Sequence, residues 1–309
     1  MSKVISTPLF YEGLRQDFAG TYREVQQRQS DGRLGMVMSG IGTTTRRTPF
    51  GYVEAAPHMM HWRHGDAIPT DAMGSKRYSV DAHPFGVRVQ WSRWDREDDQ
   101  TQSIVDQAKM AGESAAMSNE RIFRNLLLGS TDFLPQTVTA PDGANFFAAT
   151  AGGAARFGVT GGNLVTGSTV ATVSNVLTDY YSAIVRFLTM QDGKGQRLHP
   201  ASRIDQGVLI IHSAADLKVF EEAFRQQRQS SIHGSNTAAS TPSNVVIDSS
   251  RNVELWAMSE LPTGDWYVFL KGSPIKPTFV VERSPIEVEQ SFVGDRPGDM
   301  TNTTAIEYI

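Results

Sequence analysis

The sequence contains no cysteine, which excludes disulfide bonds, thiolate metal sites and cysteine nucleophiles. It also lacks a surplus of charge of either sign, because 29 basic residues stand against 33 acidic ones and the net charge is −4. Proteins whose main task is to grip nucleic acid usually carry a basic surplus or a basic stripe. This balance therefore argues against that class.

Long apolar runs are absent as well. No segment approaches the roughly 18 apolar residues that a membrane span needs, and the first eight residues, MSKVISTP, lack the apolar segment of a signal peptide. We expect a soluble protein made in a cytoplasm, with no membrane partner. Phosphate loops, dinucleotide glycine fingerprints and nucleophile elbows are also missing. We therefore predict no catalytic residue, no cofactor-binding residue and no cofactor.

The 309 residues are 39% hydrophobic, enough for a packed core of the α+β class, and the length suggests about two domains. Residues 8–28 carry a helical apolar stripe, which Gly13 and Gly20 weaken by about 1 kcal/mol each. A helix with such low intrinsic stability needs another surface to pack against. We interpret residues 1–47 as an N-terminal arm that packs on something else, with four glycines loosening its second half.

Residues 48–95 form a strand-like ribbon. Phe85–Trp91 alternates apolar and polar residues, which predicts a strand, and an earlier strand is expected at Tyr52–Val53 and again around His58–Trp62. Turn residues fill 64–76, so the ribbon is a long hairpin with a polar tip. A two-stranded hairpin is marginal alone in water, which indicates that it lies on a partner. Its aromatic residues fit an interface better than base stacking.

One long helix is predicted over residues 100–128. Apolar residues recur there at spacings of three, four and seven, Asp98 or Asp99 is a natural N-cap, and Gly129 ends the helix. Its length would be about 43 Å, typical of a strut. The middle of its buried face is rich in alanine, which permits close approach of another backbone.

The rest of the chain reads as an α/β body. An Asp142-Gly143 turn precedes a helix over Ser174–Met190, a buried strand over Val208–Ile211 and a third helix that Ser213 caps, with Leu217, Phe220 and Phe224 inward. Residues 229–244 read as an exposed polar loop. Further strands are expected at Val245–Ile247, Val253–Ala257, Trp266–Leu270 and Thr278–Val281.

Two clusters offer competing chemistry. His58, His61 and His64 could bind zinc in a metal-dependent enzyme, but on a strand His61 points away from the other two and no carboxylate completes the set, so a polar ribbon edge is favoured. The acidic residues in 95–99 could hold a divalent cation, although a helix start already explains their charge. No metal site is predicted.

The order of these elements resembles the major capsid fold of tailed bacteriophages, the Hong Kong 97-type fold. The hairpin residues Gly51-Tyr52, Trp62 and Tyr78, together with the run from Val89 to Asp99, resemble the Mu-like major head subunit family. So do the turn Asp142-Gly-Ala-Asn-Phe-Phe147 and the late segment with Asp265-Trp-Tyr-Val-Phe-Leu-Lys271, Pro274-Ile-Lys-Pro277 and Arg283. The resemblance spans roughly residues 45–290.

The resemblance implies a capsid protein of the virion, assembled in the host cytoplasm. It divides the chain into an arm (1–47), an extended hairpin loop (48–95), a spine helix (96–131), a peripheral domain body (132–205), an axial domain (206–270) and a return to the peripheral domain (271–309). Pentamers and hexamers would tile an icosahedral shell around double-stranded DNA without sequence-specific binding. Trp62, His64, Lys76 and Tyr78 of the hairpin would contact a neighbouring subunit, and Asp98 and Asp99 would cap the spine helix.

Scaffold, portal and decoration proteins are further partners that the resemblance implies, and an encapsulin-like compartment shell is the alternative within the same fold. Some shells of this fold carry a Lys–Asn isopeptide bond. Lys76 is the obvious candidate here, but no paired Asn stands out, so no crosslink is expected. Two departures from the family are visible: Ala148-Ala-Thr-Ala-Gly-Gly replaces a histidine after Phe-Phe, and the family usually continues past the position of Ile309. Either this member is short or a C-terminal part is not included.

Overall fold

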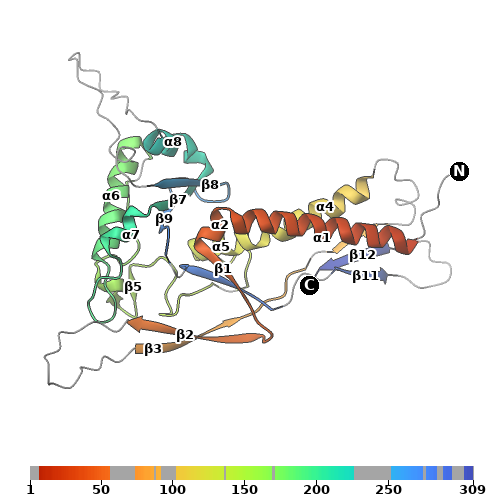
Figure 1. Cartoon of the computed structure of the whole chain (residues 1–309), viewed down its shortest axis with the longest axis horizontal. Helices are drawn as coiled ribbons and strands as arrows, with labels where there is room; N and C mark the ends of the chain where they lie inside the picture. Colours follow the sequence, from red (N-terminus) through yellow and green to blue (C-terminus); the bar gives the residue numbers. More distant parts are fainter. Residues whose placement is uncertain are drawn as a thin grey trace, which may run out of the picture. The chain divides into compact units, whose positions relative to one another are not determined.

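The computed structural model describes residues 7–55, 74–86, 88–91, 102–135, 137–168, 171–225, 252–273, 276–283, 288–293 and 303–308. The chain forms two compact units of mixed α+β structure (Figure 1). Unit 1 comprises Met1–Pro49, Ser79–Ile122 and Thr278–Ile309, and unit 2 comprises Phe50–Tyr78 and Phe123–Pro277. Within the described ranges, no helix has the length and apolar character needed to cross a membrane.

Unit 1 contains a pair of packed helices. Helix α1 (Thr7–Asp31) lies on α4 (Ser103–Ala116), and a short α2 (Arg33–Val37) follows α1. The shared core is formed by Leu14 and Phe18 of α1 with Ile104 and Ala108 of α4, all buried to 2% exposure or less. The predicted amphipathic helix is thus confirmed, and the surface it packs on belongs to the same chain.

The two helices approach closely at one glycine. A Cβ added to Gly112 of α4 would lie 2.7 Å from the backbone oxygen of Phe18 in α1, so only a residue without a side chain fits this position. The expectation that the small-residue face of this helix admits another backbone is confirmed.

Unit 1 also contains two sheets, which differ from the sequence expectations. The second half of the expected arm is ordered by pairing, because β1 (Met38–Gly42) runs parallel to β10 (Thr278–Glu282). The strand expected at Phe85–Trp91 is shorter, β4 (Arg88–Trp91), and it pairs with β12 (Thr303–Tyr308), which pairs with β11 (Val288–Val293). A period-two pattern identifies a strand but not its partner, which here lies more than 200 residues away.

The predicted strut is interrupted at Met117. Helix α4 ends at Ala116, and α5 (Ser118–Leu128) begins two residues later. Met117, between the two helices, has a ψ of −8°, and its N–H donates to the carbonyls of Glu113 and Ala115. Ser118 and Asn119 follow, and these residue types favour helix beginnings over helix interiors. A single helix of about 43 Å is therefore wrong: α4 and α5 are about 21 and 16 Å long. Gly129, with φ of +61°, ends α5 as expected.

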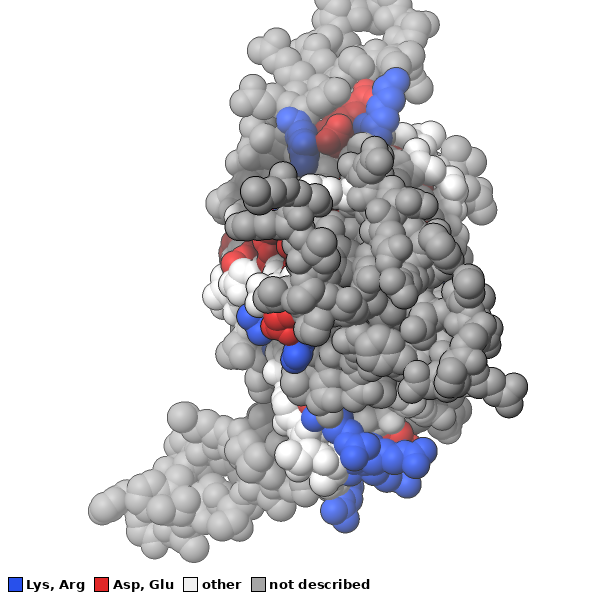
Figure 2. Space-filling view, turned by 90° about the vertical axis from the view of Figure 1, so that its right-hand side faces the viewer, with Lys and Arg blue, Asp and Glu red and all other residues white. Residues whose placement is uncertain are grey.

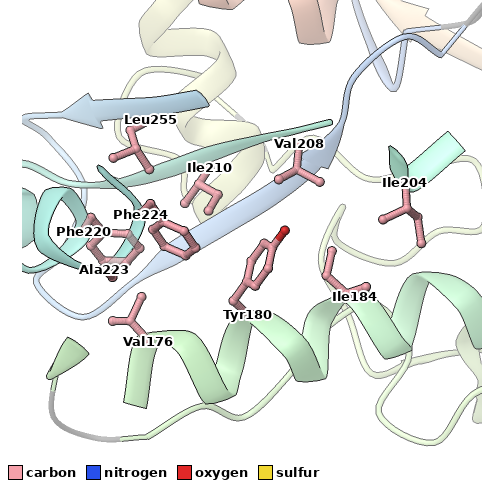
Figure 3. Packing of buried hydrophobic residues seen from close by; sticks show 10 residues of the cluster. All are labelled: Val176, Tyr180, Ile184, Ile204, Val208, Ile210, Phe220, Ala223, Phe224 and Leu255. Atoms are coloured by element: carbon pink, nitrogen blue, oxygen red, sulfur yellow. The ribbon is translucent and has the colours of Figure 1, made fainter. Parts of the chain in front are cut away.

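Unit 2 is built on a three-stranded sheet in the order β8-β7-β9. The central β7 (Val208–Ser213) runs parallel to β8 (Val253–Met258) and antiparallel to β9 (Trp266–Leu270). Helices α6 (Val173–Thr189) and α8 (Leu217–Arg225) pack on it. Figure 3 shows Tyr180 and Ile184 of α6 directed toward Val208 and Ile210 of β7. The predicted helix at Ser174–Met190 and the predicted strands at Val208–Ile211, Val253–Ala257 and Trp266–Leu270 are confirmed. The strand expected at Val245–Ile247 and the loop expected at 229–244 lie outside the described residues.

The start of α8 differs in detail from its prediction. Ser213 accepts a hydrogen bond from the Ala215 N–H, but it caps a one-turn 3-10 helix, Ala214–Asp216, that precedes α8. Leu217, the first residue of α8, is 41% exposed instead of facing the core. Asp216 accepts from the Gly264 N–H at 2.8 Å, so it fixes a distant turn. Smaller elements of unit 2 are β5 (Thr150–Ala151), β6 (Ala154–Ala155), the 3-10 turn Arg156–Gly158 and α7 (Ala201–Asp205).

Candidate assembly surfaces

The hairpin consists of β2 (Arg47–Ala55) and β3 (Gly74–Asp81), which run in opposite directions as a two-stranded sheet (Figure 1). Among the described residues, no third strand joins it. At its root, the exposed Arg47 guanidinium donates to the Ser79 hydroxyl at 3.0 and 3.1 Å and lies 3.7 Å from the Asp81 carboxylate. At its described root, the hairpin is thus held by polar contacts.

One predicted hairpin residue is fixed within its own chain. The Tyr78 hydroxyl donates to the backbone oxygen of Thr139 at 2.6 Å, and burial raises the pKa of Tyr78. This bond ties β3 to the Thr139–Asn145 turn of unit 2. The backbone of Lys76 lies in β3. Trp62 and His64 lie outside the described residues, as do His58 and His61 of the zinc alternative.

The predicted spine-helix caps, Asp98 and Asp99, also lie outside the described residues. In the part that is described, α4 begins at Ser103. Its N-cap residue is Gln102, which has a left-handed backbone (φ 58°) and makes no side-chain capping bond.

The Asp-Gly-x-x-Phe-Phe turn is held by a buried arginine. Arg156, 7% exposed, donates through Nε and Nη2 to the two carboxylate oxygens of Asp142 at 2.6 and 3.2 Å. Its Nη1 donates to the backbone oxygens of Asn145 and Phe146 at 2.8 and 2.6 Å. Asn163 completes the clamp by donating to the Phe146 oxygen at 2.7 Å and accepting from the Ala148 N–H at 2.9 Å.

This clamp positions the two phenylalanines against the sheet. Phe147 packs on Tyr267 of β9 with ring centroids 4.9 Å apart, and both phenylalanines lie against Phe269 at 6.0–6.3 Å. Phe123 of α5 packs on the same Phe269 ring at 6.0 Å. Burial, with a smaller effect of the Asp265 charge, raises the pKa of Tyr267 to about 12, so its phenol stays neutral. The clamp thus joins α5, the turn and β9.

Sequence reasoning recognised the turn but missed Arg156 and Asn163. A signal was present, because Arg156 is the only charged residue between Asp142 and Asp179. A lone charge in a segment rich in small residues is often a buried structural partner. The separation of 14 residues from Asp142 follows neither helix nor strand spacing, so periodicity could not pair them.

Two further observations concern charged and metal-ligating side chains of the described residues. These residues contain no group of three or more His, Asp or Glu side chains that could hold a metal ion. On the face drawn in Figure 2, Lys and Arg side chains form small separate groups, several of them next to Asp or Glu, and no continuous basic stripe crosses the described part of that face. This distribution agrees with the charge balance of the sequence.

Comparison with known proteins gives one family and a set of related folds. Residues 9–183 match the family described as Mu-like prophage major head subunit gpT. No curated protein sequence matches the chain.

Among solved structures, the chain is similar to the capsid of a native GTA particle and to Microbacterium phage Oxtober96, each with a TM-score of 0.52 and 11% identity. These matches cover 89 and 90% of this chain and 83 and 82% of those chains. The bacteriophage JBD30 capsid gives a TM-score of 0.48 at 14% identity, over 73% of this chain and 90% of that one. At 11% identity, the two matches with a TM-score of 0.52 show only a shared fold, the α+β fold of phage major capsid proteins.

Proposed function

The chain belongs to the Mu-like prophage major head subunit family, and from this premise we propose how it builds its shell. It is a major head subunit that forms the phage capsid, so it is a structural protein of the virion, as the resemblance implied, and neither a metal-dependent enzyme nor an encapsulin-like compartment protein. We propose that it assembles as pentamers and hexamers into an icosahedral shell around double-stranded DNA.

We further propose that the hairpin laps a neighbouring subunit. One observation carries this proposal: the β2–β3 sheet is tied to its own chain near the root, by Tyr78 and Arg47, while no described strand pairs with it further out. A two-stranded sheet is marginal alone in water, so a surface must stabilise it. Trp62, His64, Lys76 and Tyr78 are the proposed contact residues. The charge balance suits a shell that encloses DNA without gripping it.

The remaining parts are proposed by resemblance. Helices α4 and α5 would form the interrupted spine of a peripheral domain, with Asp98 and Asp99 as its proposed N-terminal caps. The sheet of β7, β8 and β9 would belong to an axial domain near the capsomer centre, and residues 1–47 to an arm. Scaffold, portal and decoration proteins are the proposed partners, and no isopeptide crosslink is expected at Lys76.

Electron microscopy of the expressed chain tests the shell proposal. We expect rings of five and six subunits and closed shells. An inert monomer at high concentration would contradict it.

A shortened hairpin tests the lapping contact. Replacing residues 57–72 with Asn-Gly, which favours a tight two-residue turn, should leave the melting temperature of the unassembled subunit within a few degrees of the unaltered chain. Particle yield should fall at least tenfold. Normal particles from this variant would refute the lapping role while leaving the shell function intact.

A further inference from the structure

Helix α6 of unit 2 has one face that nothing described covers. Its inner face carries Val176, Tyr180 and Ile184 into the core (Figure 3). The opposite face presents Tyr181, 40% exposed, and Val185, 56% exposed. Three exposed hydroxyl residues continue this outer face: Thr178, Ser182 and Thr189. Their spacing of three and four residues places all five on one stripe.

This outer face carries no free charge. The 17 residues of α6 include only two charged ones, Asp179 and Arg186. The Asp179 carboxylate accepts from the Ser168 N–H at 2.9 Å, and the Arg186 guanidinium donates to the Thr160 backbone oxygen. Both charges are thus engaged with the preceding loop. A helix face that meets solvent is normally rich in charged residues, so the composition of this face is unusual for a free surface.

The hydroxyl groups on the face are also internally bonded. Thr178 donates to the Ser174 carbonyl at 2.9 Å, Ser182 donates to the Thr178 carbonyl at 3.0 Å, and Thr189 donates to the Val185 carbonyl at 3.0 Å. Each hydroxyl therefore presents its methyl or methylene side to the outside without a donor that needs a partner. Such a face can be buried with little cost for removing polar groups from water.

The face is hollowed into an open groove of about 610 Å³ between α6 and the loop residue Val159. Small-molecule sites combine an apolar lining with a few convergent polar groups. Here the three aliphatic hydroxyls and the arginine already have partners, so a protein surface fits the groove better. Cores of protein interfaces are poor in charged residues and enriched in aromatic ones. This face has no unpaired charge and presents one exposed aromatic residue, Tyr181.

We propose that the outer face of α6 is covered by a second copy of this chain in the assembled shell. The inference rests on the proposed shell function, because a head is built mainly from copies of its major subunit and a permanent contact tolerates an uncharged, apolar face. Within a ring of five or six subunits the contact joins two different surfaces, so α6 packs on another part of its neighbour. Tyr181 is its anchor.

Cysteine labelling tests this directly, because the chain contains no other thiol. In Val185→Cys, we expect maleimide to react at least tenfold more slowly in intact particles than in the unassembled subunit, and to react fully again after the particles are dissociated. Equal rates in particles and free subunits would overturn the inference while leaving the shell function standing. A wild-type chain that forms no particles would overturn both.

A charge substitution and a photo-crosslinker test which molecule covers the outer face of α6. Val185→Lys should melt like the wild type yet lower particle yield at least tenfold, whereas the matched control Thr263→Lys, which adds the same charge at an exposed turn, should assemble. A benzophenone amino acid in place of Tyr181 should give a crosslinked band of twice the chain mass in particles. A band of another mass, from a minor or decoration protein, would refute the second-copy assignment.

Discussion

Replacing Arg156 tests the clamp that orders the Asp142–Phe147 turn. The guanidinium makes a two-point ion pair with Asp142 and donates to two backbone oxygens, and the side chain is almost fully buried. In Arg156→Ala, the Asn145 carbonyl loses its arginine donor, and the Phe146 carbonyl keeps only the bond from Asn163. Phe146 and Phe147 then lose the support that holds them on β9.

The expected loss follows from these contacts. Removing one partner of a buried ion pair costs about 3–5 kcal/mol. The Asp142 side chain is 31% exposed, so water can solvate the carboxylate left behind, which places the cost near the lower end, at about 3 kcal/mol. Arg156→Lys keeps the charge but cannot reproduce the planar fork, so about half of that loss is expected.

Urea unfolding of the unassembled subunit measures the effect, with near-ultraviolet circular dichroism to follow the packing of the aromatic cluster. Arg225→Ala is the control, because it removes an exposed pair with Glu221 in the same unit and should cost only about 0.3–0.5 kcal/mol. A double-mutant cycle with Asp142→Asn should give a coupling above about 1 kcal/mol. A loss below about 1 kcal/mol for Arg156→Ala would refute the clamp.

Three further predictions concern stability and are checked by unfolding of the unassembled subunit. Gly112→Val should destabilise by about 1–3 kcal/mol, because its side chain would meet a backbone oxygen of α1. The control Gly20→Ala, with nothing within 4 Å of the added Cβ, should stabilise by about 0.5–1 kcal/mol. Equal effects of the two substitutions would contradict the packing of α1 on α4. Tyr78→Phe should cost about 1 kcal/mol by leaving its acceptor carbonyl unpaired, and a neutral result would show that the hairpin root needs no such bond. Burial lowers the pKa of His212 in the folded protein, so the unfolded chain takes up its proton first and stability is lost as pH falls from about 6.5. His212→Asn, which keeps a donor for the Ser213 carbonyl, should reduce the slope of unfolding free energy against pH between 6.5 and 5, and an unchanged slope would contradict the assignment.

Local patterns predicted unit 2 well because its elements are short and strongly patterned. The apolar run at 208–211 and the helical period after Ser174 lead directly to β7 and α6, since burial of one face decides both. Gly129 and Gly143 mark a helix end and a turn, because both need positive φ. In each case the information lies within a few residues.

Features that depend on residues far apart in the sequence could not be predicted from local patterns. The pairing of β4 with β12 joins residues more than 200 positions apart, and a period-two pattern fits a hairpin partner equally well. The break at Met117 is a small change in ψ inside a continuous apolar stripe. The Arg156 clamp is set by loop geometry, which has no period to detect.

The pairing of β1 with β10 places early and late parts of the chain in one sheet. During synthesis, the residues of unit 2 leave the ribosome before Thr278–Glu282 does, so unit 2 can fold while β1 still waits for its partner. Unit 1 is completed only after translation has passed β10. The order of translation therefore separates the folding of unit 2 from the completion of unit 1. A chain that is still being translated cannot yet present a finished subunit to its neighbours.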